Sequence, residues 1–352
     1  MTRRVAIVTF NLGGPDGPDA VQPFLFNLFN DPAIIELPNP FRWLLARVIS
    51  KRRAPVAREI YGHLGGGSPL LKLTQDQCRA LEMAMETSDN ATMFKCFIAM
   101  RYWHPMSLET AERVREFDPD EIVLLPLYPQ YSSTTTGSSL KEWRRAADAA
   151  GLTAPTRAVC CYPVKEGWIE AQVDLVAKAL TEWPDVESPR VLFSAHGLPK
   201  KVIDAGDPYQ AQVEQTVAAV ADGLAGRGFR SLDIVTCYQS RVGPLKWIGP
   251  ATEDEVERAG AEGRGLIVVP IAFVSEHSET LVELDIEYRE LADEKGVPRY
   301  ARVPAVGDHP AFIAGLADMV WSLTLDGPAV CSSGGNRICA SDRGRCPMPS
   351  AA

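Results

Sequence analysis

The chain reads RVLFSA at residues 190–195, and His196 and Gly197 follow directly. Short apolar runs of this kind are typical of strands buried in a parallel sheet. Seven more runs of strand length recur, separated by longer segments with helical patterning, and they lie at 5–10, 95–100, 121–127, 156–162, 232–237, 265–273 and 299–306. This alternation predicts an α/β fold with parallel sheets, and four runs in each half predict two similar lobes.

The length of 352 residues also suits two domains. Lys165 to Trp183 is expected to form a helix, and the turn-rich segment at 184–189 is expected to be a connection. We therefore expect a first lobe at 1–165, a second lobe at 166–325 and a tail at 326–352 that is rich in Gly, Ser, Pro and Arg.

Composition and charge narrow the class of protein. Hydrophobic residues make up 46% of the chain and charged residues 23%, which is typical of a soluble globular protein. The net charge of −9 disfavours a nucleic-acid-binding surface. The N-terminus passes from two arginines straight into a strand-like segment, and no stretch is long and apolar enough for a membrane span. We expect a cytoplasmic protein whose eight cysteines stay out of disulfides.

Polar and aromatic side chains follow most of the predicted strands. In open α/β sheets ligands bind beyond the carboxyl ends of the strands, so this pattern predicts one large cleft there. The glycines do not change that prediction. Gly13, Gly14 and Gly17 do not fit the dinucleotide fingerprint, and the run at 65–69 lacks the lysine of a phosphate loop. Structural turns are favoured over nucleotide binding, with substrate contact as the remaining alternative.

Two features can carry acid–base chemistry. His196 ends a buried strand, where it can exchange a proton or ligate a metal, although a structural histidine is the common alternative. The segment EHSETLVELDIEY at 276–288 is expected to form a helix capped by Ser275. Its glutamates at 279, 283 and 287 would share one face, with His277 and Glu276 at its start. This face is either a solvated acidic surface or a carboxylate line that attracts a dication or moves protons.

A basic segment at about 40–72 has seven Lys or Arg residues against one Glu, with apolar residues at helical spacing among them. Such a segment is either a helix packed on the core or a lip that rests on an anionic membrane.

Three cysteines, Cys331, Cys339 and Cys346, crowd into the last 22 residues. The residues around them offer little to pack with, so a metal site is a plausible reason for their position, with free thiols as the alternative. A fourth ligand would come from Cys160 or Cys161.

Together these residues resemble the ferrochelatase family over almost the whole chain. The matching motifs are NLGGP (11–15), KRRAP (51–55), GGGSP (65–69), RYWHP (101–105), LYPQYSSTTTGSS (127–139), LFSAHGLP (192–199), YQSRVGPLKWIGP (238–250) and PIAFVSEHSETLVELDIEY (270–288). The resemblance implies two Rossmann-like lobes, each a four-stranded parallel sheet flanked by helices, with the active-site cleft between them. It also implies insertion of Fe²⁺ into protoporphyrin IX to give haem, with release of two protons.

The resemblance also implies roles for individual residues. His196 and Glu279 would be the catalytic pair, and Glu283, Glu287 and His277 would extend it into a path for Fe²⁺ or protons, with Glu276 near its entrance. Because the porphyrin must be puckered for metal entry, flat aromatic walls and propionate contacts are expected. The expected porphyrin-binding residues are Arg101, Tyr102, Tyr128, Ser132, Tyr162, Trp247 and Phe273.

Some members of the family carry a [2Fe-2S] cluster, and the C-terminal trio predicts one here. Ser133 stands where the animal enzymes place an internal cysteine, so Cys160 or Cys161 would be the fourth ligand. The segment at 40–60 would touch the membrane peripherally, on the cytoplasmic face of the inner membrane. A coproporphyrin-specific chelatase, a cobalt chelatase and a non-catalytic haem or porphyrin carrier remain alternatives.

Overall fold

All eight predicted strands are present and form parallel sheets in the computed structural model, which describes residues 2–86, 91–183, 188–241, 243–323 and 329–348. The first sheet has the order β2-β1-β3-β4-β9, with β1 at Arg3–Asn11, β2 at Thr92–Met100, β3 at Glu121–Pro126, β4 at Thr156–Cys161 and β9 at Val330–Ser332. The second has the order β6-β5-β7-β8, with β5 at Arg190–His196, β6 at Asp233–Gln239, β7 at Leu266–Pro270 and β8 at Tyr300–Arg302. Four strands of each sheet therefore share one order, which confirms two similar lobes.

The first sheet has a fifth strand that the sequence did not predict. β9 comes from the tail and pairs in parallel with β4, where Val159 lies opposite Cys331. A three-residue strand beside a run of Ser and Gly carries too little apolar pattern to be recognised.

The described chain folds into two compact units, each built around one sheet. The first unit contains the chain up to Cys161, Leu316–Arg337 and a short stretch from Pro347, and the second contains Tyr162–Gly315 and Ile338–Cys346. This division differs from the expected domains because the chain returns to the first unit within helix α11 (Pro310–Leu323), before residue 325. Trp321 of α11 packs edge-on against Phe94 of β2, with ring centroids 4.8 Å apart. The expected connection at 184–189 lies mostly outside the described residues.

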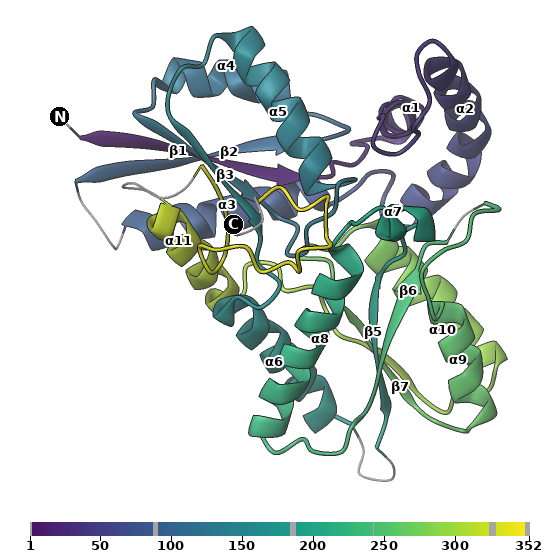
Figure 1. The fold of residues 1–352 in the computed structure, drawn as a ribbon. Coiled ribbons are helices and arrows are strands. Elements are labelled where there is room, and N and C mark those ends of the chain that lie inside the picture. Colours follow the sequence, from purple (N-terminus) through teal and green to yellow (C-terminus); the bar gives the residue numbers. More distant parts are fainter. Residues whose placement is uncertain (1, 87–90, 184–187, 242, 324–328, 349–352) are drawn as a thin grey trace. The chain divides into compact units, whose positions relative to one another are not determined.

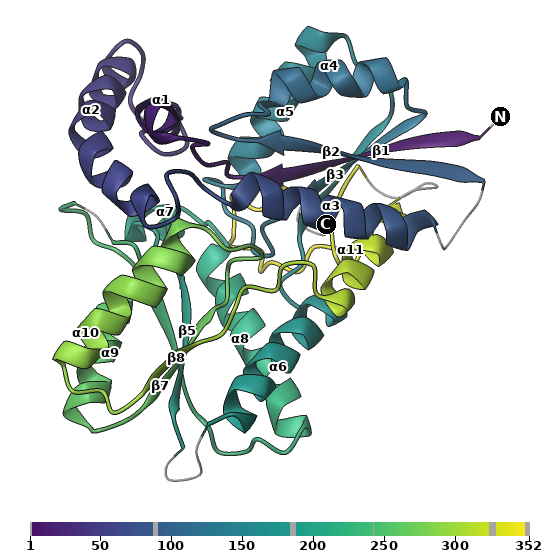
Figure 2. The ribbon, with the colours of Figure 1, turned by 180° about the vertical axis from the view of Figure 1, so that it is seen from behind.

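Helices cover both faces of the first sheet. Figures 1 and 2 show α4 and α5 over one face and α3 and α11 over the other. A short 3-10 turn (η1) leads into α1, which lies side by side with α2. The bounds are Pro18–Ala20 (η1), Val21–Phe29 (α1), Phe41–Gly62 (α2), Leu70–Glu86 (α3), Ser107–Phe117 (α4) and Thr136–Ala150 (α5).

The second sheet is covered in the same way, by α6 and α8 on one face and α9 and α10 on the other (Figures 1 and 2). Its elements are α6 (Glu166–Thr181), α7 (Lys200–Asp204), α8 (Tyr209–Gly226), α9 (Thr252–Ala261), a π-helix η2 (Glu279–Glu287) and α10 (Tyr288–Glu294).

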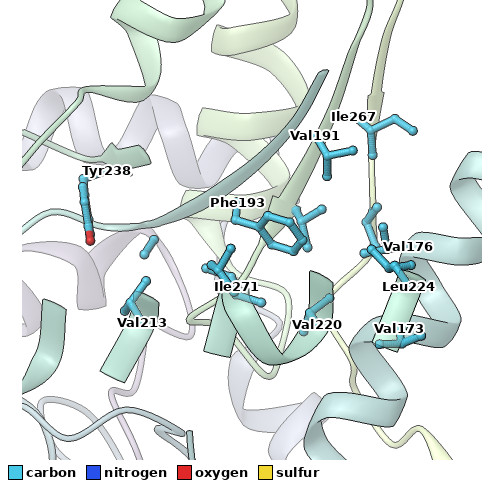
Figure 3. Close-up of a cluster of buried hydrophobic side chains, with 14 of the residues drawn as sticks. Val173, Val176, Val191, Phe193, Val213, Val220, Leu224, Tyr238, Ile267 and Ile271 are labelled. Atoms are coloured by element: carbon cyan, nitrogen blue, oxygen red, sulfur yellow. The ribbon is translucent and has the colours of Figure 1, made fainter. Parts of the chain in front are cut away.

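Burial of apolar side chains explains why these helices pack on the sheet. Figure 3 shows part of the buried cluster to which Val173 and Val176 of α6, Val220 of α8 and Phe193 of β5 belong. Phe193 is fully buried, which contributes about 1.5–3 kcal/mol relative to an exposed side chain. The helices thereby fix the strands whose carboxyl ends carry the polar residues.

Candidate active site

His196 is the last residue of β5, and its ring is only partly buried. Its Nδ1 lies 2.6 Å from the carbonyl oxygen of Gly197. Because a carbonyl oxygen only accepts hydrogen bonds, Nδ1 carries a proton and donates it, and in the neutral tautomer of this ring the lone pair lies at Nε2. Tyr209 of α8 donates to the backbone carbonyl of His196 over 3.1 Å, which fixes the chain at this point.

Glu279 lies between two histidines. Its Oε1 is 3.8 Å from Nε2 of His196, and its Oε2 is 3.9 Å from Nε2 of His277. His277 is buried against Phe273, with ring centroids 4.6 Å apart. Burial lowers the pKa of His277, so this ring is held neutral more strongly than an exposed histidine. The three side chains form an array of base, carboxylate and base.

Glu283 has a donor at each of its acceptor positions. Its Oε1 accepts from the backbone N–H of Ser240 at 2.8 Å and the hydroxyl of Tyr288 at 3.0 Å, and its Oε2 accepts from Nε2 of Gln239 at 3.0 Å and Oγ of Ser240 at 2.6 Å. Burial, and then the neighbouring Glu279, raise the pKa of Glu283, while the Ser240 and Gln239 donors oppose that rise.

The helix that carries these glutamates differs from the expected one. It begins at Glu279 rather than Glu276, and it is a π-helix that continues as α10. Ser275 therefore does not cap it. Glu276 turns away from the carboxylate line and pairs with Arg302 of β8, at 2.8 Å from Nη1. Glu287, at the end of η2, is exposed. The π-helix itself fits a functional site, where such wide turns are common.

Two of the expected porphyrin-binding residues lie at this array. Phe273 touches His277, and Trp247 packs against Gly197, where an added Cβ would come within 3.3 Å of the indole and 2.9 Å of the Gln239 carbonyl. Gly197 is therefore required by close packing beside His196. Val242, in the motif that contains Trp247, lies outside the described residues.

Arg101 and Tyr102 belong to a separate network in the first unit. Asp31 is buried and accepts from Nη2 of Arg101 at 2.8 Å and from the hydroxyl of Tyr102 at 2.7 Å. Ser138 accepts from Nε of Arg101 at 2.7 Å and donates to Asp31. Burial, and then the Asp31 charge, raise the pKa of Tyr102 well above its usual value. No sequence pattern indicates Asp31, because the partners of a single Asp in a loop cannot be read from the sequence.

The other expected porphyrin-binding residues are buried to different degrees. Ser132 is buried, with its hydroxyl 2.8 Å from Oγ1 of Thr134, and burial raises the pKa of Tyr128. Tyr162 is fully buried and packs against Phe312, with ring centroids 6.5 Å apart. Tyr102, Ser132 and Tyr162 therefore expose almost no surface to a ligand in this structure.

The cysteines fall into two groups. Cys160 and Cys161 have sulfurs 3.5 Å apart and lie beside Cys331 in the first sheet, whereas Cys339 and Cys346 belong to the second unit. Burial, with a smaller effect of Cys160, raises the pKa of Cys331 to about 11. Within the part of the chain that the structure describes, no three His, Cys, Asp or Glu side chains are grouped so that they could hold a metal ion. Within each unit taken by itself, the described cysteines do not form the four-sulfur set that a [2Fe-2S] cluster needs.

The basic segment forms α2, which exposes large apolar side chains. Phe41 is 66% exposed, Leu44 57% and Val56 60%. A groove of about 460 Å³ runs between α1 and α2 and is lined on the α2 side by Trp43, Arg47, Ser50 and Arg58. Among the described residues, none of the helices combines the length and the apolar character that crossing a bilayer requires.

Comparison with known proteins agrees with the sequence motifs. A family model described as Ferrochelatase matches residues 4–323. A ferrochelatase of Caulobacter vibrioides is 54% identical over 350 residues, which cover 99% of this chain and 98% of that protein. A ferrochelatase of Phenylobacterium zucineum is 54% identical over 97% of each chain. A structure of SirB from Bacillus subtilis with Fe³⁺ matches with a TM-score of 0.51 at 12% identity, over 91% of this chain and 95% of that one, which supports the fold alone.

Proposed function

The chain belongs to the ferrochelatase family and is a metal chelatase of haem synthesis, and we propose that His196 and Glu279 carry its reaction, the insertion of Fe²⁺ into protoporphyrin IX. The observation that carries the proposal is the His196–Glu279–His277 array, in which a carboxylate lies 3.8 and 3.9 Å from two imidazole nitrogens. Family membership disfavours the non-catalytic carrier and the coproporphyrin and cobalt chelatases.

In this proposal Nε2 of His196 accepts a pyrrole proton. The hydrogen bond from Nδ1 to Gly197 leaves Nε2 as the basic nitrogen, and Glu279 stabilises the imidazolium that forms. Removal of two pyrrole protons leaves a dianionic macrocycle that binds Fe²⁺, so charge is conserved when two protons leave.

The acidic residues beyond the pair are proposed to serve as the path for Fe²⁺ or protons. Glu279, Glu283 and Glu287 come from one helix, and His277 flanks Glu279. Glu287 is exposed and Glu283 is half-buried, so the carboxylates run from solvent toward His196. A line of carboxylates that begins in solvent and ends beside a histidine attracts a cation and offers sites for proton transfer.

Porphyrin binding is proposed for the side chains nearest this array. Trp247 and Phe273 offer aromatic faces beside His196 and His277. Arg101 and Tyr128 are proposed separately, from the motifs RYWHP and LYPQYSSTTTGSS, as contacts for propionates or the porphyrin rim. Tyr102, Ser132 and Tyr162 are also proposed contacts, and porphyrin binding would have to uncover their buried side chains.

Porphyrin metallation by the purified protein tests the proposal. His196→Ala and Glu279→Gln are expected to lower kcat by about 10²-fold or more, the usual scale for loss of an acid–base group. His309→Ala is the matched control, because His309 pairs with Asp174 elsewhere in the second unit. Iron insertion at the wild-type rate by both variants would show that the assignment is wrong. Parallel assays with coproporphyrin and with Co²⁺ measure substrate preference.

Peripheral membrane contact through residues 40–60 is part of the proposal. Exposed apolar side chains of α2 lie before and after the basic run Lys51, Arg52 and Arg53, which suits the surface of an anionic bilayer. Reversal of these three charges is expected to abolish binding to anionic vesicles, and unchanged binding would favour a helix with a purely structural role. In the cell this predicts attachment to the cytoplasmic face of the inner membrane.

The [2Fe-2S] cluster remains a prediction that rests on the sequence. Its support is the grouping of Cys331, Cys339 and Cys346 near the C-terminus. Protein purified without oxygen is expected to be red-brown and to lose its visible absorption in Cys339→Ser. A colourless wild-type preparation would contradict the prediction. No step of the reaction is assigned to the cluster.

A further inference from the structure

Gln239 joins the two halves of the proposed catalytic pair. It is the last residue of β6, lies opposite His196 in the parallel register and is fully buried. Its backbone carbonyl accepts the N–H of Gly197 at 2.8 Å, so the main chain of Gln239 fixes the turn that follows His196. This turn also supplies the carbonyl that sets the tautomer of His196.

The side chain of Gln239 reaches the other half of the pair. Its Nε2 donates to the backbone carbonyl of Glu279 at 3.1 Å and to Oε2 of Glu283 at 3.0 Å. The amide therefore ties the first turn of η2 to the end of β6. One residue holds His196 through its main chain and the glutamate helix through its side chain.

The orientation of this amide is determined by its partners. Both acceptors of Nε2 are oxygens that can only accept, so the NH₂ group must face them. On the other side, Oγ of Ser194 donates to Oε1 of Gln239 at 2.8 Å, and Oγ1 of Thr252 lies 2.9 Å from Oγ of Ser194. Ser194 and Thr252 are also fully buried. A buried chain of hydrogen bonds thus holds the amide in one rotamer.

Only glutamine fits these requirements. The site needs an acceptor toward Ser194, two donors toward η2 and no net charge. A glutamate here would direct an oxygen at two other oxygens, and a methionine would leave the buried Ser194 and Glu279 groups without their partner.

We infer that Gln239 is a positioning residue that sets the distance between Glu279 and His196. The inference rests on the proposed function, because it concerns the same pair. Residues that orient catalytic groups through hydrogen bonds contribute without touching the substrate, and misplacement by about 1 Å can cost about 10²-fold in rate.

The test compares Gln239→Met with Gln172→Met. Gln172 in α6 is also buried in the second unit, and neither polar atom of its amide has a hydrogen-bond partner among the described residues. Gln239→Met is expected to lower kcat by about 10- to 100-fold, with KM for protoporphyrin unchanged, because the substrate's own contacts remain. Gln172→Met is expected to match the wild type. Hydrogen–deuterium exchange of the peptide over 279–287 should accelerate only in Gln239→Met.

Wild-type kcat in Gln239→Met, or a rise of KM that accounts for the whole loss of kcat/KM, would overturn the inference. If Gln239→Met does not fold, Ser194→Ala takes its place, since it keeps the amide and removes its anchor. A smaller loss of kcat at constant KM is then expected, and wild-type kcat would refute the inference. A wild-type protein that inserts no iron would refute the proposed function, while the exchange measurement would still decide whether Gln239 holds η2.

Discussion

Glu283→Gln changes one oxygen of a carboxylate to NH₂ and tests whether Glu283 is held by the donors around it. If the NH₂ replaces Oε2, it meets Nε2 of Gln239, which is a donor fixed by Ser194. If it replaces Oε1, it meets the backbone N–H of Ser240. The hydroxyls of Ser240 and Tyr288 can rotate to accept, but these two N–H groups cannot. Either orientation leaves one donor without an acceptor.

An unsatisfied buried donor costs about 1–3 kcal/mol, and hydrogen bonds to a neutral amide are weaker than those to a carboxylate. We therefore expect Glu283→Gln to lower the free energy of unfolding of the second unit by about 2 kcal/mol, roughly a 30-fold change in its folding equilibrium. Urea unfolding followed by fluorescence and by far-UV circular dichroism measures this change. Glu287→Gln is the matched control, because Glu287 lies on the same helix and is exposed. Equal midpoints for the two variants would refute the reasoning.

Three further predictions concern the same unit. Gly197→Ala should reduce both the stability of the protein and kcat, because the added Cβ would meet Trp247 and the backbone carbonyl of Gln239. Thermal unfolding and metallation assays measure these two effects. A fully active variant would show that the packing around Gly197 is loose. His277 has a pKa lowered by burial, so the unfolded chain binds its proton first and wild-type stability falls as pH drops below about 6.5. His277→Asn should make the urea midpoint less dependent on pH from 6.5 downward, and an unchanged slope would contradict this. Arg302→Met should destabilise the protein by about 3 kcal/mol, because it leaves the carboxylates of Asp285 and Glu276 without their cation. A shift below about 0.5 kcal/mol in urea unfolding would argue against this.

The strands were predictable because each buried run is apolar, is as long as a typical strand and is separated from the next run by a longer segment with helical patterning. His196 and Glu279 were predictable as neighbours only through the family motifs, since no spacing rule links a strand end to a helix more than 80 residues later. The helix type was not predictable. The segment 276–288 has helical periodicity, but the wide π turn depends on tertiary partners such as Gln239, which holds the carbonyl of Glu279.

The direction of the Glu276 side chain could not be predicted from the sequence either. Its position in the motif indicates a place at the head of the carboxylate line, yet its side chain pairs with Arg302 and accepts the N–H of Ala305 at 2.9 Å. Sequence cannot show this, because both partners lie beyond the end of the motif. Charge pairing with β8 determines the direction of Glu276, and periodicity along its own segment does not.

In each unit, the residue directly after the edge strand β2 or β6 donates a hydrogen bond to a carboxylate. In the first unit Arg101, directly after β2, donates to Asp31, and in the second Ser240, directly after β6, donates to Glu283. Parallel strands bring such ends to one edge of a sheet, so the edge is predictable, whereas the partner carboxylate comes from a distant segment and is not. The two units differ at the strand next to this edge strand, which is β1 in the first unit and β5 in the second. Asn11, at the end of β1, donates from its amide to Thr74 and accepts the N–H of Leu12. His196, at the end of β5, has Nε2 facing Glu279. The acid–base residues of the proposed mechanism thus all come from the second unit, because β5 ends in a side chain that can accept a proton, whereas the equivalent strand β1 of the first unit ends in an amide.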